Sequence, residues 1–159
     1  MSRVQSLPIC SSIIPHRPVP TVGGPLVGAL AGAGIVAGPI EQSHVEKRND
    51  VLCYTTPELL EDMEVTGPLK IHLFAATSAR DTDFTARLVD VYPDGRAYNL
   101  VEGIKRARAL KSAAHPELVN PGEVYEYVIT LGHTSQLFHK GHRIRIDISS
   151  SNFRCSTAI

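Results

Sequence analysis

An alternation of apolar and polar residues with a period of two is the feature of this sequence that most constrains its fold. In the run His142–Ser149, three isoleucines alternate with Arg143, Arg145 and Asp147. Successive side chains of an extended strand point to opposite faces, so this run predicts a strand with one core face and one wet face. No stretch repeats apolar residues at the spacing of a long amphipathic helix. The pattern predicts an all-β protein.

Two longer stretches carry the same alternation. The stretch 125–131 places two tyrosines, an isoleucine and a leucine on one face, and the stretch 69–75 does the same with two leucines, an isoleucine and an alanine. Between two other runs, Tyr92-Pro93-Asp94-Gly95 offers a proline that sets φ and a glycine that accepts a positive φ, which predicts an antiparallel hairpin. The remaining extended runs are Phe84–Val91, Arg96–Val101, Val51–Thr55 and Ile104–Ala109. Together with the runs above they give about seven strands, a number that favours a sandwich or jelly roll.

Composition divides the chain near residue 50. Half of the 12 glycines and six of the 11 prolines precede it, so residues 1–49 are predicted to be an irregular Gly/Pro-rich leader and linker, and residues 50–159 the β-domain. The uncharged stretch Val22–Ile40 is interrupted by Pro25 and Pro39 and is too short between them to span a bilayer. We therefore expect no membrane partner and a cytoplasmic location.

Charge and cysteine content exclude several classes of function. Sixteen basic residues balance 16 acidic ones, so no overall field attracts the chain to nucleic acid. The three cysteines, Cys10, Cys53 and Cys155, are too few and too widely spaced for a disulfide framework, which favours a reducing compartment.

Few motifs suggest chemistry. The Gly-x-Ser-x-Gly elbow of α/β-hydrolases is missing, and its nearest echo, Gly132–Ser135, lies between two predicted strands. His139 and His142 have a spacing that could offer two imidazoles to zinc, but polar loop histidines are the favoured interpretation, also for His133. No metal or cofactor is expected.

Two carboxylates precede a predicted strand in Asp81-Thr82-Asp83-Phe84. They could cap a turn, which is the favoured interpretation, or contact a ligand or substrate. The only basic cluster, residues 105–111, lacks interleaved aromatic residues and is interpreted as a solvated or ion-paired strand face.

A set of motifs, each weak alone, is specific in its order and spacing. Together these motifs resemble the C-terminal jelly-roll domain of the cocaine esterase and X-Pro dipeptidyl-peptidase family of serine hydrolases, the CocE/NonD type. The motifs are Pro20–Gly24, Gly38–Gln42, Val51–Pro57, Glu64–Pro68, Asp81–Val91, Pro93–Ala97, Gly141–Arg145 and Ser149–Phe153.

The resemblance implies an all-β, galactose-binding-like jelly-roll sandwich that packs on an α/β-hydrolase domain, normally on the same chain. That domain would hold the catalytic serine, histidine and aspartate, so this chain is a hydrolase by family and is expected to be inactive alone. The jelly roll would help to wall the pocket for an acyl or peptidyl substrate. Asp81, Thr82, Asp83 and Phe84 are the residues assigned to that wall, and no catalytic residue is carried over.

The two ends of the chain depart from the family pattern. Residues 1–18 do not resemble the end of a hydrolase domain, and we expect the catalytic domain to lie upstream in a longer or frame-shifted reading frame. After Phe153 the family pattern implies a further loop and a closing strand, which residues 154–159 do not provide. The sandwich is therefore expected to lack a C-terminal strand and to be marginally stable by itself, because an unpaired strand edge invites association.

A freestanding jelly-roll module that binds a ligand or carbohydrate is the alternative. Sugar-binding faces usually carry exposed aromatic rings, and this chain has no tryptophan and nine aromatic residues in all. A shared β-sandwich fold does not decide between the two functions.

Overall fold

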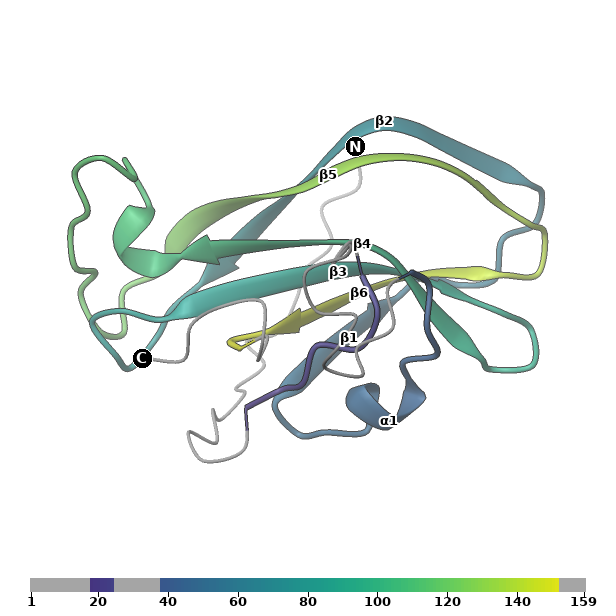
Figure 1. Cartoon of the computed structure of the whole chain (residues 1–159), viewed down its shortest axis with the longest axis horizontal. Coiled ribbons are helices and arrows are strands. Elements are labelled where there is room, and N and C mark those ends of the chain that lie inside the picture. Colours follow the sequence, from purple (N-terminus) through teal and green to yellow (C-terminus); the bar gives the residue numbers. More distant parts are fainter. Residues whose placement is uncertain (1–17, 25–37, 152–159) are drawn as a thin grey trace, which may run out of the picture.

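The computed structural model describes residues 18–24 and 38–151, which form a sandwich of two antiparallel sheets (Figure 1). One sheet has four strands in the order β1-β6-β3-β4, and the other pairs β2 with β5. The all-β prediction is confirmed. Cys10, Cys155 and the region after Phe153, where the family's closing strand is expected to be missing, lie outside the described residues. The elements are α1 (Ser43–Glu46), β1 (Val51–Thr55), β2 (Met63–Ala75), β3 (Asp83–Val91), β4 (Ala97–Arg106), a 3₁₀ helix (Ala107–Ala109), β5 (Tyr125–Phe138) and β6 (Arg143–Ser149).

The strand predicted at Ile104–Ala109 is wrong as a separate element. Residues 104–106 continue β4, and the backbone N–H of Ala107 then donates to the carbonyl of Thr82 at 2.8 Å, where the chain turns into the 3₁₀ helix. The described residues therefore contain six strands, one fewer than expected. The hairpin is confirmed: Tyr92 N–H donates to Arg96 O at 2.8 Å, and Gly95 takes a φ of 89°.

The core lies between the two sheets. Tyr127, Ile129 and Phe138 on the inner face of β5 are fully buried, and the ring of Phe84 from β3 lies 4.5 Å from that of Tyr127. Tyr127 and Ile129 occupy positions that the alternation assigned to the core, because a period-two pattern places the apolar residues of a strand on one face. Phe138 lies beyond the register shift of the β2–β5 pair, which brings it to the same face.

β5 crosses β4 at very short range. A Cβ atom added to Gly103 of β4 would lie 2.2 Å from the carbonyl oxygen of Thr130 in β5. Only glycine permits this approach, since any side chain would collide with backbone. The crossing brings the two sheets together at one side of the sandwich.

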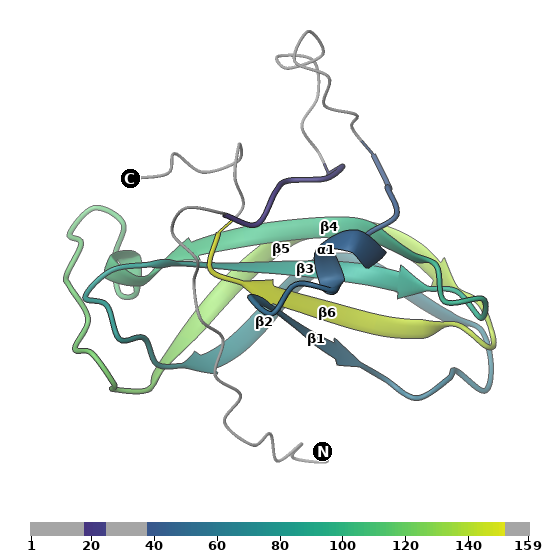
Figure 2. The ribbon, with the colours of Figure 1, turned by 90° about the horizontal axis from the view of Figure 1, so that it is seen from below.

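The opposite, outer face of the four-stranded sheet is covered rather than wet. Residues 18–24 and 38–49 run across it, with α1 resting on the sheet (Figure 2). Asp147, predicted to face solvent, is only 4% exposed as a result. Leader residues thus pack on the β-domain, and the division of the chain at residue 50 stays a prediction about its organisation.

The described residues contain no helix with the length and hydropathy needed to cross a bilayer.

Candidate functional site

The segment Asp81–Phe84 lies at one end of the sandwich, where the chain enters β3. Asp83 accepts two hydrogen bonds from the Arg106 guanidinium of β4, at 2.8 and 2.9 Å. Asp81 accepts the backbone N–H of Arg108 at 3.1 Å and forms an ion pair with its side chain at 3.5 Å. The hydrogen bond that Arg106 donates to Asp83 raises the pKa of Arg106. Both carboxylates are neutralised and fixed in place by arginines.

The other two residues of this segment differ in exposure. Phe84 belongs to the core, at 9% exposure, and faces Tyr127. Thr82 is half-buried, and its carbonyl accepts the Ala107 N–H that turns the chain after β4. Of the four residues assigned to a pocket wall, Asp81, Thr82 and Asp83 thus reach the surface in part.

The pairing of these acids with the basic cluster could have been found from the sequence. Asp81 and Asp83 are separated by one residue, as are Arg106 and Arg108. In an antiparallel hairpin such matched spacing places opposite charges across from each other, and Asp83 does pair with Arg106 in the register of β3 and β4. The interpretation of the basic cluster as an ion-paired face is confirmed for these two arginines.

A long loop adjoins this end of the sandwich. Backbone hydrogen bonds tie it to the segment before β3, from Val119 to Arg80 at 3.0 Å and from Gly122 to Thr77 at 2.8 Å. Leu118 is 52% exposed and Val124 is 63% exposed on this loop. We call the surface formed by residues 77–84 and 110–124 the end surface. It combines a rigid charged segment with apolar side chains that the described residues leave open.

His139 and His142 lie in the loop between β5 and β6, as predicted, whereas His133 lies inside β5 and not in a loop. His142 is nevertheless buried, with its Nδ1 2.8 Å from Asp90 Oδ1 and its ring 4.4 Å from that of Tyr92. The fold provides it a carboxylate partner from the neighbouring strand. His139 lies 3.4 Å from Asp62 on the surface. Across the described ranges, no three His, Cys, Asp or Glu side chains come together to hold a metal ion.

Gly132–Ser135 lies inside β5 and not between two strands. β5 is continuous here because it pairs with the equally long β2, with a register shift at Leu69 and Lys70 beside a positive φ of 99° at Gly132. The hydroxyl of Ser135 lies 3.3 Å from that of Thr66 across the pair. A continuous paired strand lacks the sharp strand-to-helix turn that exposes a nucleophilic serine.

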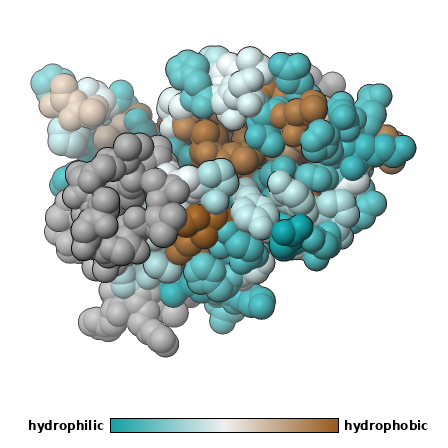
Figure 3. All heavy atoms as spheres, turned by 45° about the vertical axis from the view of Figure 1, so that its right-hand side comes forward, coloured by the Kyte–Doolittle hydropathy of each residue, from teal (hydrophilic) through white to brown (hydrophobic). Residues whose placement is uncertain are grey.

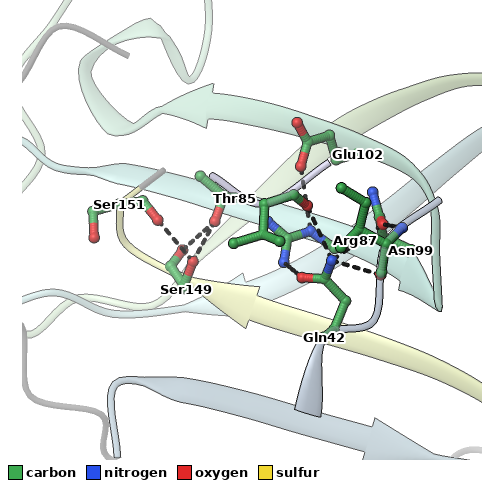
Figure 4. A network of polar contacts seen from close by, with 9 residues as sticks. Gln42, Thr85, Arg87, Asn99, Glu102, Ser149 and Ser151 are labelled. Carbon is green, nitrogen blue, oxygen red and sulfur yellow. Dashed lines mark hydrogen bonds and ion pairs between the residues drawn. The ribbon is translucent and has the colours of Figure 1, made fainter. Parts of the chain in front are cut away.

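A buried polar cluster ties the leader to the outer face of the four-stranded sheet (Figure 4). Gln42, fully buried, accepts a hydrogen bond from Arg87 at 2.6 Å and donates to the carbonyls of Val22 and Ile40 and to Asn99. Arg87 also donates to Glu102 at 3.2 Å. Sequence reasoning missed this cluster, because nothing in a Gly/Pro-rich segment marks one glutamine as its anchor.

The space between the two sheets is incompletely filled. An apolar cavity of about 130 Å³ lies between β2, β5 and β6, lined by residues such as Leu69, Leu131 and Ile146. Tyr54 of β1 is 39% exposed, and within the described residues no strand pairs with the other edge of β2. Apolar side chains are accordingly visible at the surface in Figure 3.

Comparison with known proteins agrees with this architecture. Residues 21–157 match the X-Pro dipeptidyl-peptidase C-terminal non-catalytic domain. The chain belongs to this family.

Cocaine esterase from Rhodococcus sp. (strain MB1 Bresler) is 47% identical over 139 residues, which cover 87% of this chain and 24% of that protein. Two solved structures superpose with a TM-score of 0.78. An aminopeptidase from a marine sediment Thaumarchaeota archaeon is 33% identical and an α-amino acid ester hydrolase is 29% identical, each match covering 87% of this chain. The matched region covers 25% of the aminopeptidase chain and 24% of the ester hydrolase chain. This chain thus spans about a quarter of the length of these relatives, and the resemblance predicted from its motifs is confirmed.

Proposed function

We propose that this chain acts as the β-sandwich domain of a serine hydrolase and packs on the α/β-hydrolase domain that carries the catalytic groups. The observation that carries the proposal is the 47% identity to cocaine esterase, confined to 24% of that protein. In such an enzyme a serine attacks an ester or amide carbonyl while a histidine moves the proton, so the chemistry belongs to the partner domain. The chain alone is expected to hydrolyse no ester or X-Pro dipeptidyl amide.

The end surface is the face that we assign to the hydrolase domain. Its apolar residues Leu118 and Val124 are more than half exposed, and loss of such area from water favours association. The neighbouring residues Asp81 and Asp83 are held by Arg108 and Arg106, and Thr82 between them accepts the Ala107 N–H, which suits a wall that must keep its shape beside an acyl or peptidyl group.

Reconstitution tests the assignment of the partner. The hydrolase part of the related cocaine esterase, without its own C-terminal domain, is mixed with this chain, and complex formation is followed by size-exclusion chromatography. Leu118→Asp and Val124→Asp are expected to weaken the complex at least about tenfold, since each places a charge in the contact. Leu60→Asp is the matched control. Leu60 is 86% exposed and lies in the loop before β2, which is not part of the end surface. Equal loss with the control, or no complex, would contradict the proposal.

The pocket-wall role has a separate test. In the reconstituted complex, Thr82→Tyr enlarges a half-buried side chain of the wall and is expected to raise KM for a bulky acyl ester more than for an acetyl ester. Thr66→Tyr makes the same replacement at an exposed position of β2, outside the end surface, and is expected to change neither. An unchanged ratio of the two KM values in Thr82→Tyr would remove this segment from the pocket.

A further inference from the structure

Asp147 is buried on the outer face of β6 without a hydrogen-bonding partner. Its residue is 4% exposed, and neither carboxylate oxygen accepts a hydrogen bond from any described residue. Its cross-strand neighbours are Cys53 of β1 and Arg87 of β3. A buried carboxylate without donors is costly in its charged form, because nothing replaces the water that it has lost.

The nearby arginines are engaged elsewhere. Arg87 donates to Glu102 and Gln42, and Arg145 donates to Glu46 and to the hydroxyl of Thr55. The glutamate side chains are at most 9% exposed. Three carboxylates therefore face two guanidinium groups, which leaves one negative charge in excess when all are ionised.

The thiol of Cys53 compensates Asp147 only in part, because its interaction with the carboxyl lowers the pKa of Asp147 by less than burial raises it. Burial, together with the charge of Asp147, raises the pKa of the Cys53 thiol to about 12, so it is a neutral group near the carboxylate. Burial likewise raises the pKa of Asp147, and burial and the charge of Asp147 raise that of Glu46. These pKa shifts agree with the geometry. The excess negative charge favours a proton on one carboxyl group of the cluster at a pH where exposed carboxyl groups are ionised.

The leader closes the space beside Asp147. A cavity of about 10 Å³, the size of one water molecule, is bounded by Thr85, Glu102 and Asp147 of the sheet and by Val19 and Val45 of the leader. Val19 and Val45 are at most 2% exposed. Val19 is held by its N–H, which donates to Ser151 Oγ at 2.9 Å. The cavity has room for a single water molecule, so fuller hydration of an ionised Asp147 requires this segment to move.

We propose that residues 18–24 and 38–49 form a proton-dependent clasp, closed over Asp147 while its carboxyl is neutral and released when the carboxyl ionises. An acid whose pKa is raised by folding stabilises the closed state fully below its ordinary value. That stabilisation is lost as pH rises through the raised value. The clasp therefore loosens with increasing pH.

Amide hydrogen exchange tests the clasp. Val19 and Gln42 report on it, since the N–H of Gln42 donates to Ala97 at 2.8 Å across the covered face. Wild type and Asp147→Asn are compared at each pH from about 4 to about 8, so that the intrinsic exchange rate cancels. Equal exchange is expected at the low end and exchange at least about tenfold slower in Asp147→Asn at the high end, since one pKa unit corresponds to tenfold.

Asp90→Asn is the matched control. Asp90 is equally buried, at 3%, but is paired with His142. Its amide variant is expected to give no protection at Val19 and Gln42 at any pH. Exchange in Asp147→Asn as fast as in wild type at the high end would overturn the proposal.

Infrared spectroscopy of the wild-type chain keeps the proposal testable if Asp147→Asn does not fold. A protonated carboxyl band is expected to persist above the titration of exposed carboxylates and to disappear together with the protection of Val19. Ionisation of all carboxyl groups in one step at ordinary values would overturn it.

Discussion

The two faces of the four-stranded sheet are buried by opposite means. Side chains such as Ile129 and Phe138 cover the inner face, and their burial depends on volume and apolar area. On the outer face, a hydrogen bond from Arg87 to Gln42 joins the sheet to the leader, and Arg87 forms an ion pair with Glu102 within the sheet. The inner face can tolerate a gap, as its cavity shows, whereas the outer face depends on the identity of each partner.

The largest effect is expected when the outer face loses its cation. Arg87→Met leaves Glu102 buried without its partner and should lower the free energy of unfolding by about 3–5 kcal/mol. Urea denaturation measures this loss. The double variant Arg87→Met with Glu102→Met should recover most of it, because it removes both charges. A loss below about 1 kcal/mol in the single variant would show that the outer face does not depend on this pair.

Truncating a side chain on the inner face should lower the free energy of unfolding somewhat less than Arg87→Met does. Ile129→Ala removes three carbon atoms from a fully buried position and should lower the free energy of unfolding by about 3 kcal/mol. Val128→Ala, on the exposed face of the same strand, is the control and should change it by less than about 0.5 kcal/mol. Similar losses in both variants would mean that β5 does not divide the core from the surface.

The third largest loss of stability is expected at Gln42, which anchors the leader to the sheet. Gln42→Ala removes four hydrogen bonds of one side chain and should cost about 2 kcal/mol, since Arg87 and two leader carbonyls lose a partner. Gln136→Ala, at a partly exposed position of β5 whose amide donates only to the neighbouring Leu137 carbonyl, should have little effect on thermal unfolding. If the two glutamine variants melt alike, the polar cluster does not hold the leader.

The smallest losses of stability are expected from the ion pairs at the end of the sandwich that carries the end surface. Arg106→Ala breaks a partly exposed pair with Asp83 and should cost about 1 kcal/mol. Lys111→Ala breaks the exposed pair with Glu117 and should leave the melting temperature unchanged. A loss from Arg106→Ala as large as that from Arg87→Met would contradict the view that burial sets the value of these ion pairs.

Local pattern was sufficient for most strands. The isoleucines of β6 and the tyrosine and isoleucine of β5 face the core as the alternation predicts, and Pro93 and Gly95 form the expected turn. The pattern did not anticipate the 3₁₀ helix at Ala107, since that turn is made by a hydrogen bond to the distant Thr82. The pairing of Asp83 with Arg106 could be inferred once the hairpin was expected.

The sequence by itself determined the all-β fold, the inner core and the family, because each of these is recorded in local alternation or in motif order. The tertiary structure alone decided the fate of the polar residues. Asp147, His142 and Gln42 are all hydrophilic in sequence, yet each is buried by a segment far away along the chain. Whether such a residue is solvated, paired or left with an uncompensated charge depends on the segments packed against it, and the one-dimensional pattern does not contain that information.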